Sequence, residues 1–562
     1  MINYFHKFNV TSSYEELRRC CISAAQSVAK NPQGASQFSS ENGLVQVVVD
    51  NFDAQIASQN GQKATHGSAM IATQSVQPKP EHLQQINEIP KIKRFKQEET
   101  KACQLELADV EVQRYNGPNK PNMPGKYKYK VVPPLHFLAR QKVSINRAIL
   151  DDLEFLMAVI SQDPCPEYGG FNTKRARESG KQPEQKTGIM YVPFLDMAPA
   201  EPDTMKTAMV KAQQLTAMTG QEWTIFTNDQ QLYKIAVHVS WVDNALFEKF
   251  IPRLGGMHLL MSFVGAVGHL MAGSGLEDIL KSAFAGVPKL LSGKNFPQNV
   301  RALRIVMEEI LRPLLINKQE QLCSMSDVID LLDECSQYSN TAKMWVDCLI
   351  KPVLCMMLFV RAEREGDWPL HLFAVKRMIP YFFAANHFNY AHYGLYYLRS
   401  MQQFPPAVLK SFMNGEHVSR HQDGIWNGTW SDLFIETTYM RYGHGPSGVI
   451  GSTLNYSTLA VWALSMSSLT QIGKDVEEMA DGEIETIISH HKEECLPRIN
   501  DDKVDQNKIG ETISTCIDIF DIDEHPQTGI VNIHTGQVVD DPGLNVHNAV
   551  EIGTEQWWDF EN

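Results

Sequence analysis

The stretch that decides the fold of this chain is a strongly apolar run that carries acids: Leu44-Val45-Gln46-Val47-Val48-Val49-Asp50-Asn51-Phe52-Asp53. Its β-branched residues are typical of a buried strand, and Asp50 stands at the end of the run. A second stretch has the same pattern and ends in Asp229: Trp223-Thr224-Ile225-Phe226-Thr227-Asn228-Asp229. A third predicts a helix with Glu436 on its apolar side: Ser431-Asp432-Leu433-Phe434-Ile435-Glu436. Carboxylates brought to one point in this way are what a two-metal site for phosphoryl transfer requires.

Patterns between these stretches predict an α/β fold. Asn60-Gly61 marks a turn, after which 66–74 is predicted to run antiparallel to the first strand. A third strand is predicted at 189–195, where Pro193 indicates an edge position or a bulge. The other predicted elements of this part are helices at about 144–160, 202–219 and 231–241, and strands at 223–227 and 250–254.

The predicted order is three strands followed by helix, strand, helix and strand, which is the order of ribonuclease-H-like sheets. Open α/β sheets bind ligands at the carboxyl ends of their strands, where Asp229 is expected, while Glu436 would come from a late helix. The predicted fold class is α/β, a ribonuclease-H-like mixed sheet with a large all-helical insertion and an acidic C-terminal tail. The predicted segments are an N-terminal helical segment at 1–43, the core at 44–256 with polar loops at 75–130 and 163–187, the helical insertion at 257–425, final core helices at 426–473 and the tail at 474–562.

The net charge of −14 is unevenly distributed along the 562 residues. Residues 474–562 contain 22 acidic and 5 basic side chains, a net charge of −17, whereas the rest of the chain has a net charge of +3. The acidic character therefore belongs to the tail, and the nearly neutral body is compatible with a nucleic-acid partner. Residues 75–130 and much of 493–562 are rich in Pro, Gly and charge, so we expect them to pack loosely.

Basic clusters in the body are candidates for contact with the phosphates of DNA. These clusters lie at 91–96, 126–130 and 174–177. The alternative interpretation of each cluster is a solvated loop. The residues predicted to contact nucleic acid are Lys126, Lys128, Lys130, Lys174, Arg175 and Arg177.

The sequence predicts a nuclear or cytoplasmic protein that is neither secreted nor embedded in a membrane. The N-terminus has no basic region followed by an apolar one, as a signal peptide would. The apolar stretch 254–273 approaches the ~20 residues of a membrane span. It contains His258 and His269, however, which favours a buried helix. Ten cysteines without a C-x-x-C pair favour reduced thiols.

Three acids are predicted to be both the catalytic and the metal-binding residues: Asp50, Asp229 and Glu436. Asp50 and Asp229 would bridge paired Mg²⁺ or Mn²⁺ ions that activate water or a 3′-hydroxyl, and Glu436 would complete the second ion's shell. Asp53 is the alternative for Asp50. Asp432, one helical turn before Glu436, is the alternative for that residue. For Asp229 the alternative is a purely structural role as the N-cap of the following helix.

Three further residues are open to a functional and a structural interpretation. His258 follows two glycines and opens an apolar helix, where it would contact a phosphate or orient an acid, or else be a buried structural histidine. Trp426 and Trp430 would stack on a base or pack in the core.

We expect the carboxylates of the three catalytic acids to lie mutually within ~8 Å, a span that two ions ~3.5–4 Å apart bridge.

The chain resembles a transposon-derived, ribonuclease-H-like family that is repeated many times in animal genomes, over about 40–560. The matching stretches are Val49-Asp50-Asn51-Phe52-Asp53 with Thr65-His66 after it, Asn228-Asp229-Gln230-Gln231-Leu232-Tyr233, Leu254-Gly255-Gly256-Met257-His258-Leu259-Leu260-Met261-Ser262-Phe263, Asn389-Tyr390-Ala391 and Asp432-Leu433-Phe434-Ile435-Glu436. More distantly, it is similar to DDE-type transposases with an all-helical insertion, such as the hAT group. The resemblance implies metal-dependent phosphoryl transfer on DNA, with homo-oligomer formation left open. The alternative is a catalytically silent or truncated derivative that acts as a nucleic-acid or protein interaction scaffold.

Overall fold

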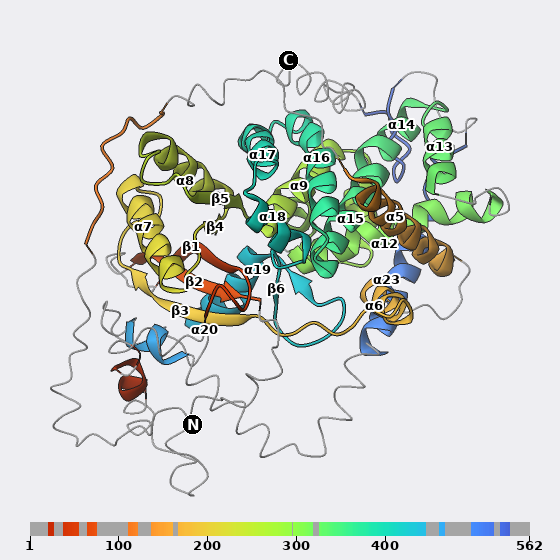
Figure 1. Ribbon diagram of the computed structural model, residues 1–562. Coiled ribbons are helices and arrows are strands. Elements are labelled where there is room, and N and C mark those ends of the chain that lie inside the picture. Colours follow the sequence, from red (N-terminus) through yellow and green to blue (C-terminus); the bar gives the residue numbers. More distant parts are fainter. Residues whose placement is uncertain are drawn as a thin grey trace, which may run out of the picture.

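A sheet region and a larger helical region lie side by side in this protein (Figure 1). The computed structural model describes residues 21–26, 28, 38–55, 64–75, 111–121, 137–160, 167–294, 296–318, 325–444, 460–466, 496–521 and 529–539. Among these residues helices predominate over strands, and the fold is a mixed α/β fold.

Five strands form one mixed sheet in the spatial order β3-β2-β1-β4-β5. β1 (Val45–Gln55) pairs antiparallel with β2 (Ala64–Gln74), which pairs antiparallel with β3 (Gly188–Leu195). β4 (Thr224–Asn228) runs parallel to β1, and β5 (Phe250–Leu254) runs parallel to β4. The five strands confirm the sequence prediction, and β3 lies at an edge of the sheet, as its internal proline indicated.

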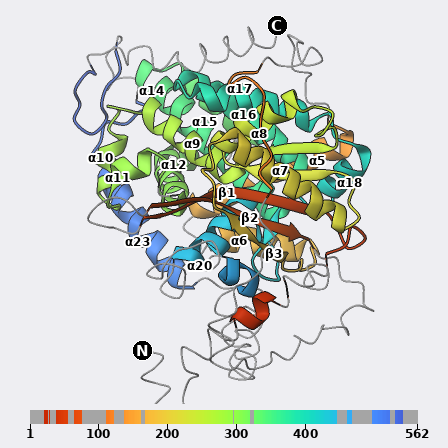
Figure 2. The ribbon, with the colours of Figure 1, turned by 90° about the vertical axis from the view of Figure 1, so that its left-hand side faces the viewer.

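One face of the sheet is covered by two helices that follow β3 and β4 in the chain. The odd-numbered valines of β1 pack here against α7 (Pro202–Met218) and α8 (Gln230–Val242). Figures 1 and 2 show both helices on the same side of the sheet. Both were predicted from the sequence, at 202–219 and 231–241.

The opposite face is covered by a helix from much later in the chain. Val48 and Phe52 of β1 pack here against α19 (Ser431–Ile435) and the π-helical turn η4 (Glu436–Met440). Asp50 lies between these two apolar residues on the strand. Because side chains two residues apart on a strand share a face, Asp50 is directed toward α19 and η4. Figure 2 shows α20 (Arg441–His444), which continues this helix, below the sheet.

The helical region begins with α9 (Gly256–Leu270), directly after β5, and nine of its residues are buried. This confirms the buried helix predicted at 254–273. No helix in the described ranges is long and apolar enough to cross a membrane. The other helices that pack into this region are α5 (Ala139–Ile160), α6 (Tyr168–Glu178), α10 (Leu276–Lys281), α11 (Val287–Leu291), α12 (Phe296–Lys318), α13 (Met325–Cys335), α14 (Asn340–Trp345), the π-helical η3 (Val346–Ile350), α15 (Lys351–Glu365), α16 (Trp368–Ala384), α17 (Phe388–Met401) and α18 (Pro406–Met413).

A short two-stranded ribbon connects the helical region to α19. Its strands are β6 (Ser419–Arg420) and β7 (Gly428–Thr429). Trp426 is buried, and the guanidinium carbon of Arg361 lies 5.0 Å from the centre of its ring. Trp430 is also buried. Both tryptophans therefore have the core-packing role, which was one of their two predicted interpretations.

Part of the C-terminal segment packs against the body. α23 (Leu496–Ile513) lies beside α12, and its Ile509 is fully buried. Ile530 and Ile533 belong to the same large core, in a tight turn closed by an antiparallel bridge. The prediction of loose packing at 493–562 is wrong for these residues, because isolated isoleucines within a charged segment still bury apolar surface.

Candidate metal centre

The parallel pairing of β1 with β4 stops after Val48, near the ends of β4 and β5, and each of these three strands leads to a polar residue close to this level. Asp50 lies on β1, Asp229 follows β4 directly, and His258 is the third residue of α9, just after β5. Asn228 is opposite Leu254 in the β4–β5 ladder, so these two strands end at the same level. Ligand sites of open α/β sheets form at the carboxyl ends of the parallel strands.

Two glycines bring the start of α9 close to α19. The backbone amide of Gly255 donates to the carbonyl oxygen of Asn228 at 2.6 Å. A Cβ atom on Gly255 would overlap the carboxylate of Asp432, and one on Gly256 would overlap the indole ring of Trp430. The close approach of the two segments therefore requires glycine at both positions, since any side chain would push α19 away.

Asp432 receives three hydrogen bonds from the start of α9. Its Oδ1 accepts from the backbone amide of Met257 at 3.2 Å, and its Oδ2 accepts from the backbone amide of His258 at 3.1 Å. The ring Nδ1 of His258 also lies 3.1 Å from Oδ2. Burial opposes the charge on Asp432, but the bonds and charge of His258 outweigh it and lower the pKa of Asp432. Asp432 is thus an ionised cap of α9 that fixes the imidazole ring.

Glu436 lies one helical turn after Asp432 and faces β1. It opens the π-helical turn η4, where the hydrogen-bonding pattern of the helix widens. One ligand atom each of Asp50, His258 and Glu436 lie within 4.8 Å of one another. The sheet, α9 and the α19–η4 helix therefore each contribute one residue to a cluster that suits a metal ion.

The electrostatics of the cluster centre on Asp50. Its side chain is 4% exposed; Oδ1 accepts from the amide of Asn51 at 2.8 Å, and Oδ2 has no hydrogen-bond partner among the described residues. Burial raises the pKa of Asp50 well above its usual value, and His258 opposes that shift while Asp229 and Glu436 add to it. A buried carboxylate oxygen without a partner is costly, so it favours either a proton or a cation.

His258 supplies positive charge to the same cluster. Burial opposes its protonation, but the hydrogen bond to Asp432 and the charges of Asp432, Asp50 and Asp229 outweigh burial and raise the pKa of His258 to about 10. Without a cation, the imidazolium therefore balances part of the carboxylate charge. With a cation, His258 would have to be neutral, because metal ligands bind in their deprotonated form.

The donors of the cluster fit a divalent cation. Asp50 and Glu436 offer carboxylate oxygens, and His258 offers a ring nitrogen. Since Nδ1 of His258 is engaged by Asp432, Nε2 is the nitrogen left for the cluster. The unpartnered oxygen of Asp50 is the observation that favours this fit, because a cation would satisfy it.

Asp229 has the structural role that was its alternative interpretation, yet it lies near the cluster. It is the N-cap of α8, and its Oδ1 accepts from the backbone amide of Leu232 at 2.8 Å. Burial raises the pKa of Asp229, and its charge in turn raises the pKa of Asp50. Asp53 lies in β1 opposite His66. The structure thus brings together Asp50 and Glu436, with Asp229 beside them.

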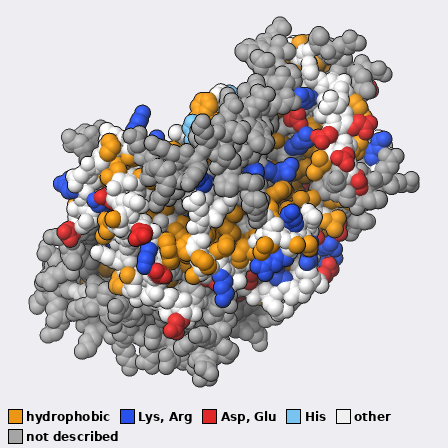
Figure 3. Space-filling model, turned by 45° about the horizontal axis from the view of Figure 1, so that its top comes forward, with side chains coloured by type: hydrophobic (Ala, Val, Ile, Leu, Met, Phe, Trp, Pro, Cys, Tyr) orange, Lys and Arg blue, Asp and Glu red, His pale blue; other side chains and the backbone are white. Residues whose placement is uncertain are grey.

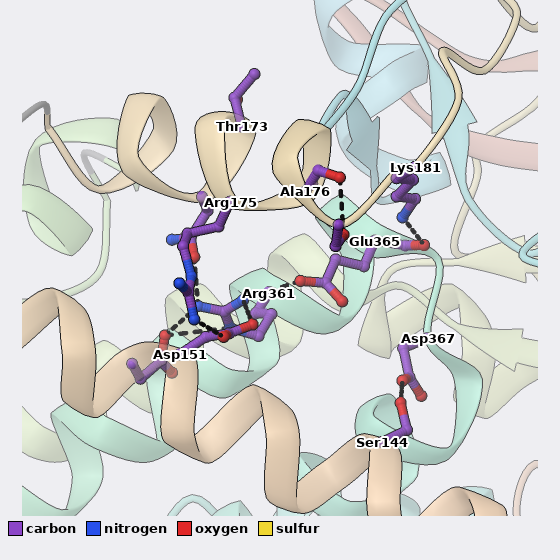
Figure 4. A network of polar contacts seen from close by, with 12 residues as sticks. Ser144, Asp151, Thr173, Arg175, Ala176, Lys181, Arg361, Glu365 and Asp367 are labelled. Atoms are coloured by element: carbon purple, nitrogen blue, oxygen red, sulfur yellow. Dashed lines mark hydrogen bonds and ion pairs between the residues drawn. The ribbon is translucent and has the colours of Figure 1, made fainter.

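The predicted nucleic-acid contacts divide into two groups. Lys126, Lys128 and Lys130 lie outside the described residues, whereas Lys174, Arg175 and Arg177 lie on α6. Arg175 forms ion pairs with Asp151, at 3.3 Å, and with Glu154. Figure 4 shows Arg175 directed toward Asp151 and Arg361 beneath α6. A phosphate would have to compete with these carboxylates for Arg175.

Charged side chains of both signs occur on one face of the described part of the molecule. On the face in Figure 3, basic and acidic side chains of the described residues are interspersed, and apolar side chains gather along its middle.

The role of Asp432 was missed at the sequence level, where it was only an alternative to Glu436. A signal was present: Gly255-Gly256 allows a close neighbour, and an apolar helix that begins without a capping side chain needs an acceptor from elsewhere. Which residue supplies that acceptor is not encoded locally, because Asp432 is 175 positions from Met257.

The fold and the cluster define a mixed α/β protein with a candidate cation site at the end of its parallel strands. The profile of a family described as a domain of unknown function (DUF8702) matches residues 167–334 and 315–560. The chain belongs to this family. Comparison with curated proteins and with solved structures gives no match.

Proposed function

We propose that this chain is a ribonuclease-H-like protein, derived from a DDE-type transposase, that carries out metal-dependent phosphoryl transfer on DNA. The observation that carries the proposal is the buried carboxylate of Asp50 on β1. One of its oxygens lacks a partner in the described chain, and Asp50 shares a 4.8 Å cluster with Glu436 and His258. Carboxylates placed in this way hold divalent cations in phosphoryl-transfer enzymes.

The arrangement of the sheet supports the same proposal. Asp50 lies on the first strand, which is central and is flanked by antiparallel β2 and parallel β4. Asp229 follows β4, and Glu436 comes from a late helix packed on the sheet, after a long helical segment. These are the positions of acids that the resemblance to DDE-type transposases implies.

The residues of the cluster have separate chemical tasks in this proposal. Asp50 and Glu436 would hold a Mg²⁺ or Mn²⁺ ion, and the bound ion supplies Lewis acidity toward a phosphoryl oxygen. Asp432 keeps the ring of His258 in place and caps α9. Asp229 caps α8 and adds negative charge beside the site, which strengthens the attraction for a cation.

A second function is favoured by one specific observation. His258 and Asp432 form an internal ion pair, so the imidazolium balances carboxylate charge without any metal. Such a self-balanced cluster suits a catalytically silent derivative that acts as a nucleic-acid or protein interaction scaffold. The two functions share a nuclear or cytoplasmic location, and the scaffold differs in having no turnover and in binding either a nucleic acid or a protein.

A cleavage and strand-transfer assay tests the proposal. Full-length protein is incubated with end-labelled single-stranded and duplex DNA, with Mg²⁺, with Mn²⁺ or with a chelator. We expect products that form only with a cation. Their rate of formation should fall by about 100-fold or more in Asp50→Asn and in Glu436→Gln, because each variant loses part of the stabilisation that the cation gives to the transition state. The control is Glu222→Gln, an exposed acid at the opposite end of β4 that pairs with Lys249.

The outcomes separate the two functions. DNA binding without products in any cation supports the scaffold. Products that persist at the wild-type rate in Asp50→Asn would show that the phosphoryl transfer does not use this cluster, and the proposal would fail.

A further inference from the structure

We infer that His258 is a direct ligand of the cation, held in place by Asp432, and that the centre binds a first-row transition metal ion in preference to Mg²⁺. The inference rests on the proposed function only in assuming that the cluster is a cation site. It replaces Asp229 by a nitrogen donor in the ligand set predicted from the sequence.

The first argument is the orientation of the ring. Nδ1 of His258 lies 3.1 Å from Oδ2 of Asp432, an oxygen that also accepts from the backbone amide of His258. With Nδ1 as the donor in this contact, the lone pair of the neutral ring stands on Nε2. A histidine that donates one nitrogen to a carboxylate and offers the other to a metal is a recurrent arrangement in metal sites.

The second argument is the rigidity of this pair. Asp432 is 1% exposed, and both of its oxygens are also occupied by backbone amides of α9. Both oxygens are thus directed to the start of α9, and Asp432 is not part of the compact group of ligand atoms, so it serves as a positioning residue. Gly255 and Gly256 let α9 lie directly against α19, so His258 is held toward Asp50 and Glu436 by the backbone itself.

The third argument is the place of Asp229. Its Oδ1 is used by the amide of Leu232 at the start of α8, and the compact group of ligand atoms within 4.8 Å contains His258 in its stead. The one buried carboxylate oxygen of the cluster that lacks a partner in the described chain belongs to Asp50. The structure thus supplies two oxygen donors and one nitrogen donor.

The donor set decides the metal. Mg²⁺ prefers an octahedral shell of oxygen atoms and usually keeps several water molecules. An imidazole nitrogen adds affinity for transition metals, which increases from Mn²⁺ through Co²⁺ to Ni²⁺. A site with one histidine and two carboxylates is therefore expected to select Mn²⁺ or Co²⁺ over Mg²⁺.

The test uses Mn²⁺ alone, added to the full-length protein without nucleic acid. Electron spin-echo spectra of the bound ion report a coupled nitrogen directly, and competition with Mg²⁺ gives relative affinity. In the wild type we expect a histidine nitrogen coupling and at least about tenfold weaker binding of Mg²⁺. His258→Gln should remove the coupling, and the matched control His387→Gln, whose Nδ1 bonds Ser262 instead, should retain it.

Two further variants separate the ligand sets. Asp432→Asn should weaken Mn²⁺ binding by about 10–100-fold once the affinity is corrected for the proton displaced from His258, as expected for a residue that orients a ligand. Asp229→Asn, which can still cap α8, should weaken it by less than about tenfold. A bound Mn²⁺ without nitrogen coupling in the wild type, or loss of binding in Asp229→Asn but not in His258→Gln, would overturn the inference. Because no DNA is present, these outcomes are independent of whether the protein cleaves DNA.

Discussion

Replacing Asp432 by Asn tests whether this carboxylate holds His258 in its charged form in the metal-free protein. Asn keeps the shape and one acceptor oxygen for the amides of α9, but it removes the negative charge beside the ring. Hydrogen bonds to charged groups contribute about 1.5–3 kcal/mol. One pKa unit corresponds to about 1.36 kcal/mol, so the loss should lower the pKa of His258 by about 1–2 units from its wild-type value of about 10.

The same change should alter stability in a pH-dependent way. The folded-state pKa of His258 is raised, so its stabilising contribution is complete below the ordinary histidine pKa of about 6.5. That contribution is lost as the pH rises through about 10 in the wild type. Near pH 6, Asp432→Asn should therefore be less stable by about 1.5–3 kcal/mol, and the difference should shrink as the pH approaches the folded pKa.

Two measurements check these values on chelator-treated protein. NMR of protein labelled in the histidine rings gives the pKa of His258, which His258→Gln assigns. Urea unfolding of the wild type, both single variants and the double variant gives a coupling energy, expected at about 1.5–3 kcal/mol near pH 6. A coupling below about 0.5 kcal/mol, or an unchanged His258 pKa in Asp432→Asn, would refute the reasoning.

Three shorter predictions follow from the packing and the charges. Gly256→Ala should destabilise the fold by about 1–3 kcal/mol, because its Cβ meets the ring of Trp430; Gly394→Ala, in a helix with ordinary clearance, should be stabilising by up to about 1 kcal/mol in the same thermal melts. Deletion of 496–562 should increase the rate of amide hydrogen exchange in α12, because the deletion removes α23 and uncovers the core residues beneath it. An unchanged exchange rate in α12 would contradict this packing. Mn²⁺ affinity, measured by titration, should rise from pH 6 toward pH 9, since the ion displaces a proton from His258, whose pKa is about 10; a flat profile would exclude this residue as a ligand.

The elements of the sheet were predictable because the signals are local. The run around Val47 has the composition of a buried strand, and the acids of β1 and β4 stand beside those runs in the sequence. Alternation along β1 also fixes that Asp50 shares a face with Val48 and Phe52, since the period of a strand is two residues.

The roles within the site were not predictable in the same way. Asp229 has the sequence signal of a ligand and also that of an N-cap, and the structure shows its Oδ1 capping α8 through the amide of Leu232. Asp432 and Glu436 lie on the same helical face, and the sequence does not state which of them meets the start of α9. Only the packing of α19 against the sheet assigns Asp432 to His258 and Glu436 to Asp50.

The sequence by itself determined the strands, the apolar character of α9 and the placement of an acid on β1, because these depend on the periodicity and chemistry of neighbouring residues. The tertiary structure alone decided that a histidine joins the acids and that part of the charged C-terminal segment belongs to the core. His258 and Asp432 are 174 positions apart, so their contact arises only when the glycine turn and α19 come within van der Waals distance. The physical reason is that hydrogen-bond partners and burial, which set the charge of each group, are properties of the packed chain and not of any local stretch.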